Sequence, residues 1–275
     1  MAEQSLSALA GKRIVVTRAE AQSEGLFDAL RSRRAEPILF PLIRIVALED
    51  YGALDAALVR LRAGDWIILT SQNAVTPVAT RARMLRKEFF GAANGILVAA
   101  VGPATAKAAQ ALNVKVDYVA KTHDGVSLAN ELKERLRGHL ALLPRSDLAG
   151  GALPATIQKI GGQAVEVIAY RTERVNEWEG QLVDMILEGA VDAVVCFSPS
   201  AVHALTDLLA ARDAVNFQDK VAFAAIGAVT AQAFRSAGIR KPLVAVDASA
   251  EATVKILSDY FASREQFQNA GATNS

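Results

Sequence analysis

The sequence predicts an α/β protein that consists of two small doubly wound domains with parallel sheets, related by an internal duplication. Short apolar runs of strand length alternate with longer segments of helical spacing, a pattern typical of βα units. Several motifs also occur twice, in the same order and at nearly the same offset. About half of the 275 residues are hydrophobic, which is enough for one large or two small domains with cores of their own.

The repeat is clearest in three pairs of blocks. They are DWIILTSQNAV (65–75) with DAVVCFSPSAV (192–202), AVGPATA (100–106) with AIGAVTA (225–231), and RIVVTR (13–18) with LALLPR (140–145). The first pair aligns without a gap and sets Asp65 on Asp192 and Ser71 on Ser198, 127 positions apart. Three ordered blocks at nearly one offset indicate that the chain is written twice.

Each copy alternates predicted strands with predicted helices. The strands are expected at 13–17, 66–70, 96–101, 140–144, 191–197 and 221–226. This alternation favours parallel strands joined by right-handed crossovers, with helices on both faces of each sheet. Asn113 and Gly238 follow the helices that begin at Thr105 and Thr230, and both residue types accept the left-handed conformation that closes a helix.

Two segments depart from the alternation, AEPILFPLIRIVAL (35–48) and GGQAVEVIAYRTERV (161–175). The first contains Pro37 and Pro41, which a central strand would not tolerate. We therefore expect extended connectors, able to pair as a two-stranded linker, rather than core strands. With two linkers, residues 12–34 would complete the domain formed by 176–262, but tandem domains would show the same repeat, so the residues alone leave this open.

Composition excludes several classes of function. Lys+Arg and Asp+Glu nearly cancel, with a net charge of +1, so we expect no nucleic-acid or membrane partner. The single cysteine, Cys196, excludes a disulfide and a Cys-rich metal site. His123, His139 and His203 have no ligand-like spacing, and no metal is expected. There is also no G-x-G-x-x-G, P-loop or G-x-S-x-G signature.

Nothing in the sequence suggests targeting to a membrane or export. Residues 1–11 carry Glu3 and lack both a basic start and a long apolar stretch, unlike a signal peptide. No apolar run approaches the roughly 20 residues of a membrane span. We expect a cytoplasmic protein with flexible, polar ends.

The residues that follow the predicted strands form a pattern of their own. Ligands of open α/β sheets bind outside the carboxyl ends of the strands. There the sequence places small, hydroxyl-bearing or glycine residues, which expose N–H groups at helix N-termini and favour anions. Arg18 and Arg145 add fixed cations with planar donor forks. The pattern predicts a site for several carboxylates or phosphates.

Other roles for these residues remain open from the sequence. Ser71, Ser198 and Ser200 are also typical helix N-caps, and the glycines typical of tight turns. Cys196 is best explained as a small buried hydrophobe. His203 lies beside the Ser-Pro-Ser turn but has Thr76 as its counterpart in the first copy, which argues against catalysis.

The ordered motifs VVTR, TSQNAV, AVGPATA, VIAYRT, FSPSAV and FAAIGAVTA resemble those of the uroporphyrinogen-III synthase family over about residues 12–260. The resemblance implies two HemD-like (flavodoxin-like) domains joined by a two-stranded linker. It implies domain 1 at 12–36 plus 174–262, domain 2 at 47–161, linker strands at 37–46 and 162–173, and flexible termini at 1–11 and 263–275.

The activity that the resemblance implies is cyclisation of the linear tetrapyrrole hydroxymethylbilane, with inversion of ring D and loss of water, to give uroporphyrinogen III. No cofactor or metal takes part. The substrate's eight carboxylates suit a site made of helix N-termini and arginines. The partners implied are the substrate and hydroxymethylbilane synthase for hand-over, and the protein is expected to be a monomer.

By position in the motifs, Tyr170 is implied as the donor to the leaving hydroxyl, although a half-exposed aromatic would be its ordinary role. The substrate-binding residues implied or predicted are Arg18, Ser71, Asn73, Gly102, Thr105, Arg145, Ser198, Ser200, Gly227 and Thr230. IGAVTA replaces the family's commoner IGPTTA, so Ala228 and Val229 put a side-chain role at 229 in doubt. The competing hypotheses are an anion-binding protein without catalysis and a regulatory protein that has lost activity.

Overall fold

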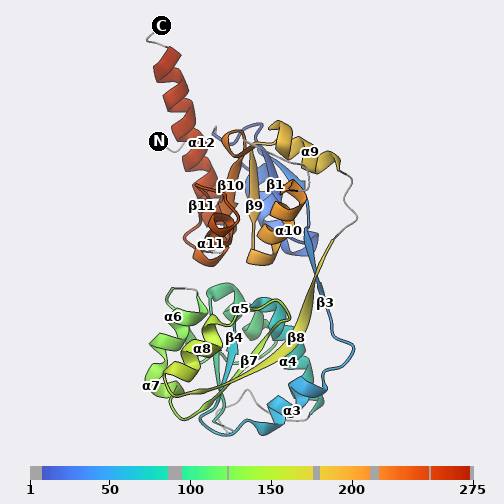
Figure 1. Ribbon diagram of the computed structural model, residues 1–275, viewed down its shortest axis with the longest axis vertical. Helices are drawn as coiled ribbons and strands as arrows, with labels where there is room; N and C mark the ends of the chain where they lie inside the picture. The colour runs from blue at the N-terminus through green and yellow to red at the C-terminus, as the bar shows by residue number, and fades with distance from the viewer. Residues whose placement is uncertain are drawn as a thin grey trace. The chain divides into compact units, whose positions relative to one another are not determined.

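The computed structural model describes residues 8–85, 95–122, 124–175, 180–210, 217–247 and 249–272, and the chain divides into two compact units. Unit 1 combines the chain up to Arg44 with the chain from Arg174 onward, and unit 2 is Ile45–Glu173. Each unit is a sheet with helices on both faces (Figure 1), so the predicted α/β class with parallel sheets is confirmed. No helix among the described residues is long and apolar enough to cross a membrane.

Unit 1 contains a five-stranded parallel sheet in the order β11-β10-β9-β1-β2. Its strands are β1 (Arg13–Val16), β2 (Glu36–Leu39), β9 (Ala193–Cys196), β10 (Ala222–Ala225) and β11 (Leu243–Val244). Its helices are α2 (Glu24–Arg31), α9 (Gln181–Glu188), α10 (Pro199–Ala210), α11 (Ala228–Ser236) and α12 (Ala250–Ala272), with the short 3-10 helices η1 (Glu20–Gln22) and η2 (Phe217–Asp219).

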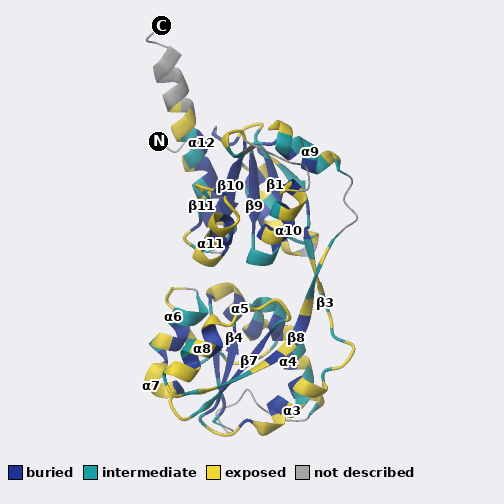
Figure 2. Ribbon diagram, viewed as in Figure 1, coloured by how far each residue is buried: buried dark blue, intermediate teal, exposed yellow. Residues whose placement is uncertain are grey.

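Helices cover both faces of the sheet of unit 1. Successive residues of a strand point to opposite faces, so each strand contributes side chains to the core on both sides. Val15 and Val194 pack with residues of α9, α10 and α11 in one cluster. Ile14 and Val195 pack with residues of α2 and α12 in another. Figure 2 shows the central strands dark blue along their length, while the outer sides of the helices are teal and yellow.

Unit 2 contains a six-stranded sheet in the order β3-β8-β7-β4-β5-β6, with parallel pairing from β8 to β6. Its strands are β3 (Ile43–Val46), β4 (Trp66–Leu69), β5 (Leu97–Ala100), β6 (Tyr118–Val119), β7 (Leu140–Ser146) and β8 (Gln163–Arg174). Its helices are α3 (Gly52–Arg60), α4 (Gln72–Met84), α5 (Pro103–Ala111), α6 (Gly125–Glu131), α7 (Lys133–Leu136) and α8 (Ala152–Lys159). Residues of α3, α4 and α5 pack on one face and residues of α6, α7 and α8 on the other.

The repeated blocks occupy the same places in the two sheets. Setting β7 on β1, β8 on β2 and β4 on β9 makes the strand orders equal. The register agrees as well, because Val16 pairs with Leu39 in unit 1 and Leu143 pairs with Glu166 in unit 2. In unit 1, β1 and β2 come from the first copy of the repeat and β9 from the second. In unit 2, β7 and β8 come from the second copy and β4 from the first, so each sheet depends on contacts between residues far apart in the sequence.

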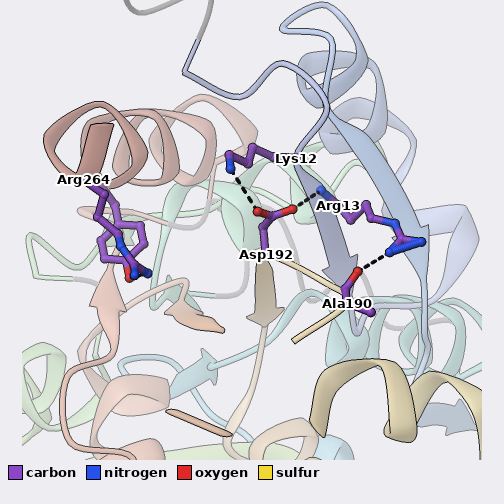
Figure 3. Close-up of polar contacts among 6 residues, drawn as sticks. Lys12, Arg13, Ala190, Asp192 and Arg264 are labelled. Atoms are coloured by element: carbon purple, nitrogen blue, oxygen red, sulfur yellow. Dashed lines mark hydrogen bonds and ion pairs between the residues drawn. The ribbon is translucent and has the colours of Figure 1, made fainter. Parts of the chain in front are cut away.

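An aspartate at the amino end of the sheet joins these distant strands in each unit. In unit 1, Asp192 Oδ2 accepts a hydrogen bond from the main-chain N–H of Arg13 at 2.9 Å, and Oδ1 pairs with Lys12 at 3.1 Å (Figure 3). In unit 2, Asp65 Oδ1 accepts from the N–H of Leu140 at 2.9 Å. Leu140 corresponds to Arg13 in the repeat, so the same contact is made twice.

The structure confirms the predicted strands within one or two residues at each end. It also confirms the predicted helix ends, because Asn113 has a φ of 57° and Gly238 a φ of 86°. These are left-handed conformations that asparagine and glycine adopt more readily than other residues.

The expected linker bounds 37–46 and 162–173 differ from the structure. Strand β2 is part of the unit 1 sheet, where Pro37 pairs with Ile14. Proline is tolerated there because β2 lies at the edge of the sheet. Strand β8 likewise pairs with β7 from Gln163 to Tyr170. The chain passes between the units within β3 and at the end of β8, and these two strands are neighbours.

The termini also differ from the expected flexible segments. Ala8 and Leu9, within the expected segment 1–11, are fully buried in unit 1 against residues of α2 and α12. At the other end, α12 extends to Ala272, so residues 263–272 are helical. The other residues of the expected termini, 1–7 and 273–275, lie outside the described residues.

We predict that Asp65→Ala lowers the free energy of unfolding by about 1–3 kcal/mol, because it leaves the N–H groups of Leu140 and Arg62 without their acceptor. Urea unfolding measures this. Asp28→Ala, which removes an exposed aspartate of α2, is the matched control and should change the value by less than about 0.5 kcal/mol. Equal effects would show that the aspartate contact does not stabilise the sheet.

Candidate functional site

The carboxyl ends of parallel strands lie at one edge of each sheet, opposite the aspartates described above. The structure places the candidate residues at or near these ends, with Tyr170 inside β8 and opposite the last residue of β7. Unit 2 holds Ser71, Asn73, Gly102, Thr105, Arg145 and Tyr170, and unit 1 holds Arg18, Ser198, Ser200, Gly227 and Thr230.

The hydroxyl of Tyr170 is the candidate catalytic group at the edge of unit 2. A register shift between β7 and β8 sets it opposite Ser146, and only 8% of its surface is exposed. The side chains of Ser71 and Asn73 lie close enough to its hydroxyl to act on its pKa. The half-exposed aromatic that the sequence alone suggested for this position is therefore wrong.

The electrostatics of this group favour a neutral hydroxyl. Burial raises the pKa of Tyr170 above its ordinary value, and this is only partly opposed by the hydrogen bonds from Ser71 and Asn73 and by the charge of Arg145. An unperturbed tyrosine already has a pKa of about 10. The hydroxyl is thus protonated at neutral pH and able to donate.

The N-terminus of α4 supplies the frame for this hydroxyl. Ser71 is the N-cap residue, with extended backbone, and its Oγ accepts a hydrogen bond from the N–H of Asn73 at 3.2 Å. The serine that caps the helix is therefore also a partner of Tyr170. Ser71 can therefore be the helix cap and a residue of the candidate site at the same time.

Ser198 and Ser200 occupy the equivalent position in unit 1. Ser198 Oγ accepts from the N–H of Ala201 at 3.2 Å and lies 3.3 Å from Ser200 Oγ. This is helix-cap geometry. His203 is exposed on α10, and no hydrogen bond between it and either serine is found among the described residues.

The two glycine turns begin helices without a side-chain cap. Gly102 precedes Pro103 at the first position of α5, and Gly227 precedes α11. Open space surrounds the position that a Cβ would take at Gly227. Thr105 and Thr230, in the first turns, are both buried. These helix N-termini can accept an anion through their main-chain N–H groups, while the buried threonines pack inside their units.

Arg145 is less available than the sequence suggests. Only 9% of its surface is exposed. One terminal nitrogen pairs with Glu166 Oε2 at 2.5 Å and the other donates to the carbonyl of Gly150 at 2.6 Å. Its Nε is buried without a partner among the described residues. The guanidinium is therefore occupied within unit 2.

Arg18 has a different environment at the corresponding place in unit 1. Its Nε donates to Gln22 Oε1 at 3.0 Å, and its Cζ lies 5.2 Å from the ring centroid of Phe197. Burial lowers the pKa of Arg18, and no ion pair with a carboxylate is found among the described residues. It is a partly buried cation without internal compensation.

Sequence reasoning missed Glu166 and the side chains around Ser146. Ser146 Oγ lies 2.8 Å from Thr172 Oγ1, and Asp147 Oδ1 accepts from the N–H of Thr172 at 2.9 Å. These bonds hold the segment after β7. Glu166 and Asp147, with Arg145, line a small pocket beside β7 and β8. Comparison of the two copies could have indicated Glu166, because it is a charged residue at a position where the first copy has the apolar Leu39.

No cluster of three or more potential metal-ligating side chains occurs in the part of the chain that the structure describes. His123 lies outside that part. Cys196 is fully buried in β9, and burial raises the pKa of its thiol to about 12.

We predict that Cys196 does not react with thiol reagents in the folded protein at pH 8. With a pKa of about 12, only about one thiol in ten thousand is ionised at that pH. Absorbance with a disulfide reagent should show no reaction in buffer and one thiol per chain in denaturant. Rapid reaction of the folded protein would contradict the buried placement.

Comparison with known proteins agrees on one family. The family model described as uroporphyrinogen-III synthase HemD matches residues 24–255. The uroporphyrinogen-III synthase of Synechococcus elongatus is 28% identical over 84% of this chain and 86% of its own length, and that of Chlorobaculum parvum is 26% identical over 85% and 92%.

Solved structures show the same fold at lower identity. A mutant uroporphyrinogen III synthase from Thermus thermophilus has a TM-score of 0.67 at 20% identity, covering 93% of this chain and all of that one. The synthetase from Helicobacter pylori has a TM-score of 0.54 at 16% identity, covering 90% of this chain and 99% of that one. Since the family model matches most of the sequence, the chain belongs to the uroporphyrinogen-III synthase (HemD) family of enzymes.

Proposed function

We propose that this chain cyclises hydroxymethylbilane to uroporphyrinogen III, with inversion of ring D and loss of water. The family assignment supports this activity. The observation that carries the mechanism is the buried, neutral hydroxyl of Tyr170, held at the N-terminus of α4 by Ser71 and Asn73.

The first step is departure of the hydroxyl group from the substrate. Its C–O bond breaks, the oxygen leaves as water after taking a proton from solvent, and the bilane becomes an azafulvene-type cation stabilised by the adjacent pyrrole nitrogen. Tyr170 donates a hydrogen bond to the departing oxygen. With a pKa above that of an ordinary tyrosine, the hydroxyl is a donor rather than a strong acid.

The second step forms the ring. The substituted carbon of ring D attacks the cation and gives a spiro intermediate, which fragments and recloses with ring D inverted. The final loss of a proton restores the aromatic pyrrole. The enzyme's contribution here is to hold the reacting carbons in place, which can lower a barrier by up to about 7–11 kcal/mol in well-oriented cases.

The carboxylates of the substrate are held by main-chain N–H groups at helix N-termini and by an arginine side chain. Ser198 caps α10 with its side chain, whereas the N-termini of α5 and α11 follow Gly102 and Gly227 without a side-chain cap. A bound carboxylate would complete the hydrogen bonds of such helix ends. No cofactor or metal is part of this proposal.

The proposal also includes the setting in which the enzyme works. We place it in the cytoplasm as a monomer that receives its unstable substrate from hydroxymethylbilane synthase. Light scattering on the purified protein tests the monomer. Cell fractionation tests the location, and a shorter lag in the coupled assay than free diffusion allows would support hand-over.

We predict that the purified protein, coupled to a source of hydroxymethylbilane, gives mainly the type III isomer. The spontaneous reaction gives type I, so the isomer ratio measured by chromatography after oxidation tests the proposal directly. An unchanged ratio together with tight binding of the product would instead favour an anion-binding protein without catalysis.

We predict that Tyr170→Phe lowers kcat by about 10- to 100-fold, the effect of losing one hydrogen bond to a developing charge. The difference should be the same at pH 7 and pH 9, because the raised pKa keeps the hydroxyl protonated. Steady-state rates of type III formation measure it.

Two variants control this experiment. Tyr118→Phe removes the hydrogen bond from Tyr118 to Glu131, 2.8 Å in length, and should leave kcat within about threefold of wild type. Ser198→Ala removes a helix cap and should cost about 1 kcal/mol of stability with a smaller effect on kcat than Tyr170→Phe. If Tyr170→Phe is as active as Tyr118→Phe, the hydroxyl of Tyr170 has no part in the reaction.

A further inference from the structure

We infer that the two copies of the duplicated arginine have separate tasks: Arg18 binds a carboxylate of the substrate directly, whereas Arg145 stabilises unit 2 and binds none. The identity of the ligand rests on the proposed function. The division itself rests on the different surroundings of the two side chains.

The repeat explains why the surroundings differ. Arg18 and Arg145 are 127 positions apart in the sequence. Arg18 follows the carboxyl end of β1, which pairs with β2, and Arg145 lies near the carboxyl end of β7, which pairs with β8. In β2 and β8, Leu39 pairs with Val16 and Glu166 pairs with Leu143, which are equivalent positions in equivalent registers. The carboxylate that neutralises Arg145 is therefore replaced by an aliphatic side chain in the copy that contains Arg18.

Both terminal nitrogens of Arg145 are already engaged within unit 2, and little of the side chain is exposed to a ligand that approaches from solvent. Its terminal nitrogens are bonded to Glu166 and to the carbonyl of Gly150, and its remaining Nε is buried. Glu166 itself is about half exposed, so the pair presents a carboxylate to solvent. The two charges largely cancel, so the pair offers a negatively charged substrate little attraction.

Arg18 keeps its terminal nitrogens available. Only its Nε is engaged, by Gln22, and the guanidinium lies over the ring of Phe197. Neither terminal nitrogen has a hydrogen-bond partner within the described ranges. Partial burial makes an uncompensated charge unfavourable, so binding of an anion would relieve it.

The chemistry of the site favours a carboxylate. A guanidinium offers two parallel N–H groups that match the two oxygens of a carboxylate. Phe197 directly precedes Ser198, the N-cap of α10, and the positive end of that helix adds to the attraction for an anion.

The first test compares Arg18→Gln with Arg145→Gln in the full-length protein. Arg18→Gln should raise KM about 10- to 100-fold, the effect of losing a hydrogen bond between charged groups, with kcat within about threefold and an unchanged melting temperature. Arg145→Gln should lower the melting temperature by several degrees and leave KM nearly unchanged. An equal rise of KM in both variants would overturn the inference.

A second pair of variants tests the inference without touching either arginine. Leu39→Glu places a carboxylate where Glu166 stands in the other copy, so it should neutralise Arg18 and raise KM as Arg18→Gln does. Leu39→Gln has the same shape without the charge and should leave KM near wild type. If Leu39→Glu and Leu39→Gln have the same KM, Arg18 does not bind the substrate.

Binding measurements separate this inference from the proposed function. Fluorescence titration with uroporphyrin, which carries eight carboxylates, should show weaker binding and a smaller dependence on salt for Arg18→Gln and Leu39→Glu. If wild type gives no type III isomer but this pattern appears, only the proposed function fails. If wild type is active and all variants bind uroporphyrin equally, only the role of Arg18 fails.

Discussion

The hydrogen bond from a strand's first N–H to the carboxylate of Asp192 or Asp65 is the contact on which each unit depends. It joins β1 to the chain before β9 and β7 to the chain before β4, across 179 and 75 positions of sequence. A register shift of one residue would break this contact and turn every side chain to the other face. The same register sets the position of the carboxyl ends of the strands, where Tyr170 lies in unit 2 and Arg18 in unit 1. The aspartate contact thus lies at one edge of each sheet and the candidate site residues at the other.

Two sheets with matching strand orders carry different side chains at their carboxyl ends. Ser71 acts on the hydroxyl of Tyr170 in unit 2, while in unit 1 Ser198 lies beside Ser200 instead. The position 127 before Tyr170 is Ile43, which cannot take part in such a network. Unit 2 therefore holds the neutral donor and unit 1 the uncompensated cation.

Much of this arrangement could be predicted from the sequence, because apolar runs and the repeat report burial and topology directly. Pro37 was misleading, since its tolerance depends on the edge position of β2, which is a tertiary fact. The burial of Leu9 beneath helices from both ends of the chain was equally inaccessible. The partner of Arg145 required the pairing of β7 with β8, including its register shift. Local patterns indicated the elements, whereas side-chain partners across strands needed the structure.

The chemistry of a cation-forming reaction gives a reason for this distribution of charge. Loss of the hydroxyl leaves positive charge on the substrate, and an uncompensated arginine near it would oppose the step by about 4 kcal/mol at 4 Å and an effective dielectric constant of 20. Arg145, whose charge acts on Tyr170, is paired with Glu166 and so opposes the cation less. A neutral tyrosine donor adds no charge of its own. Arg18, for which no carboxylate partner is found among the described residues, belongs to the other unit, and we infer that it attracts a carboxylate of the substrate.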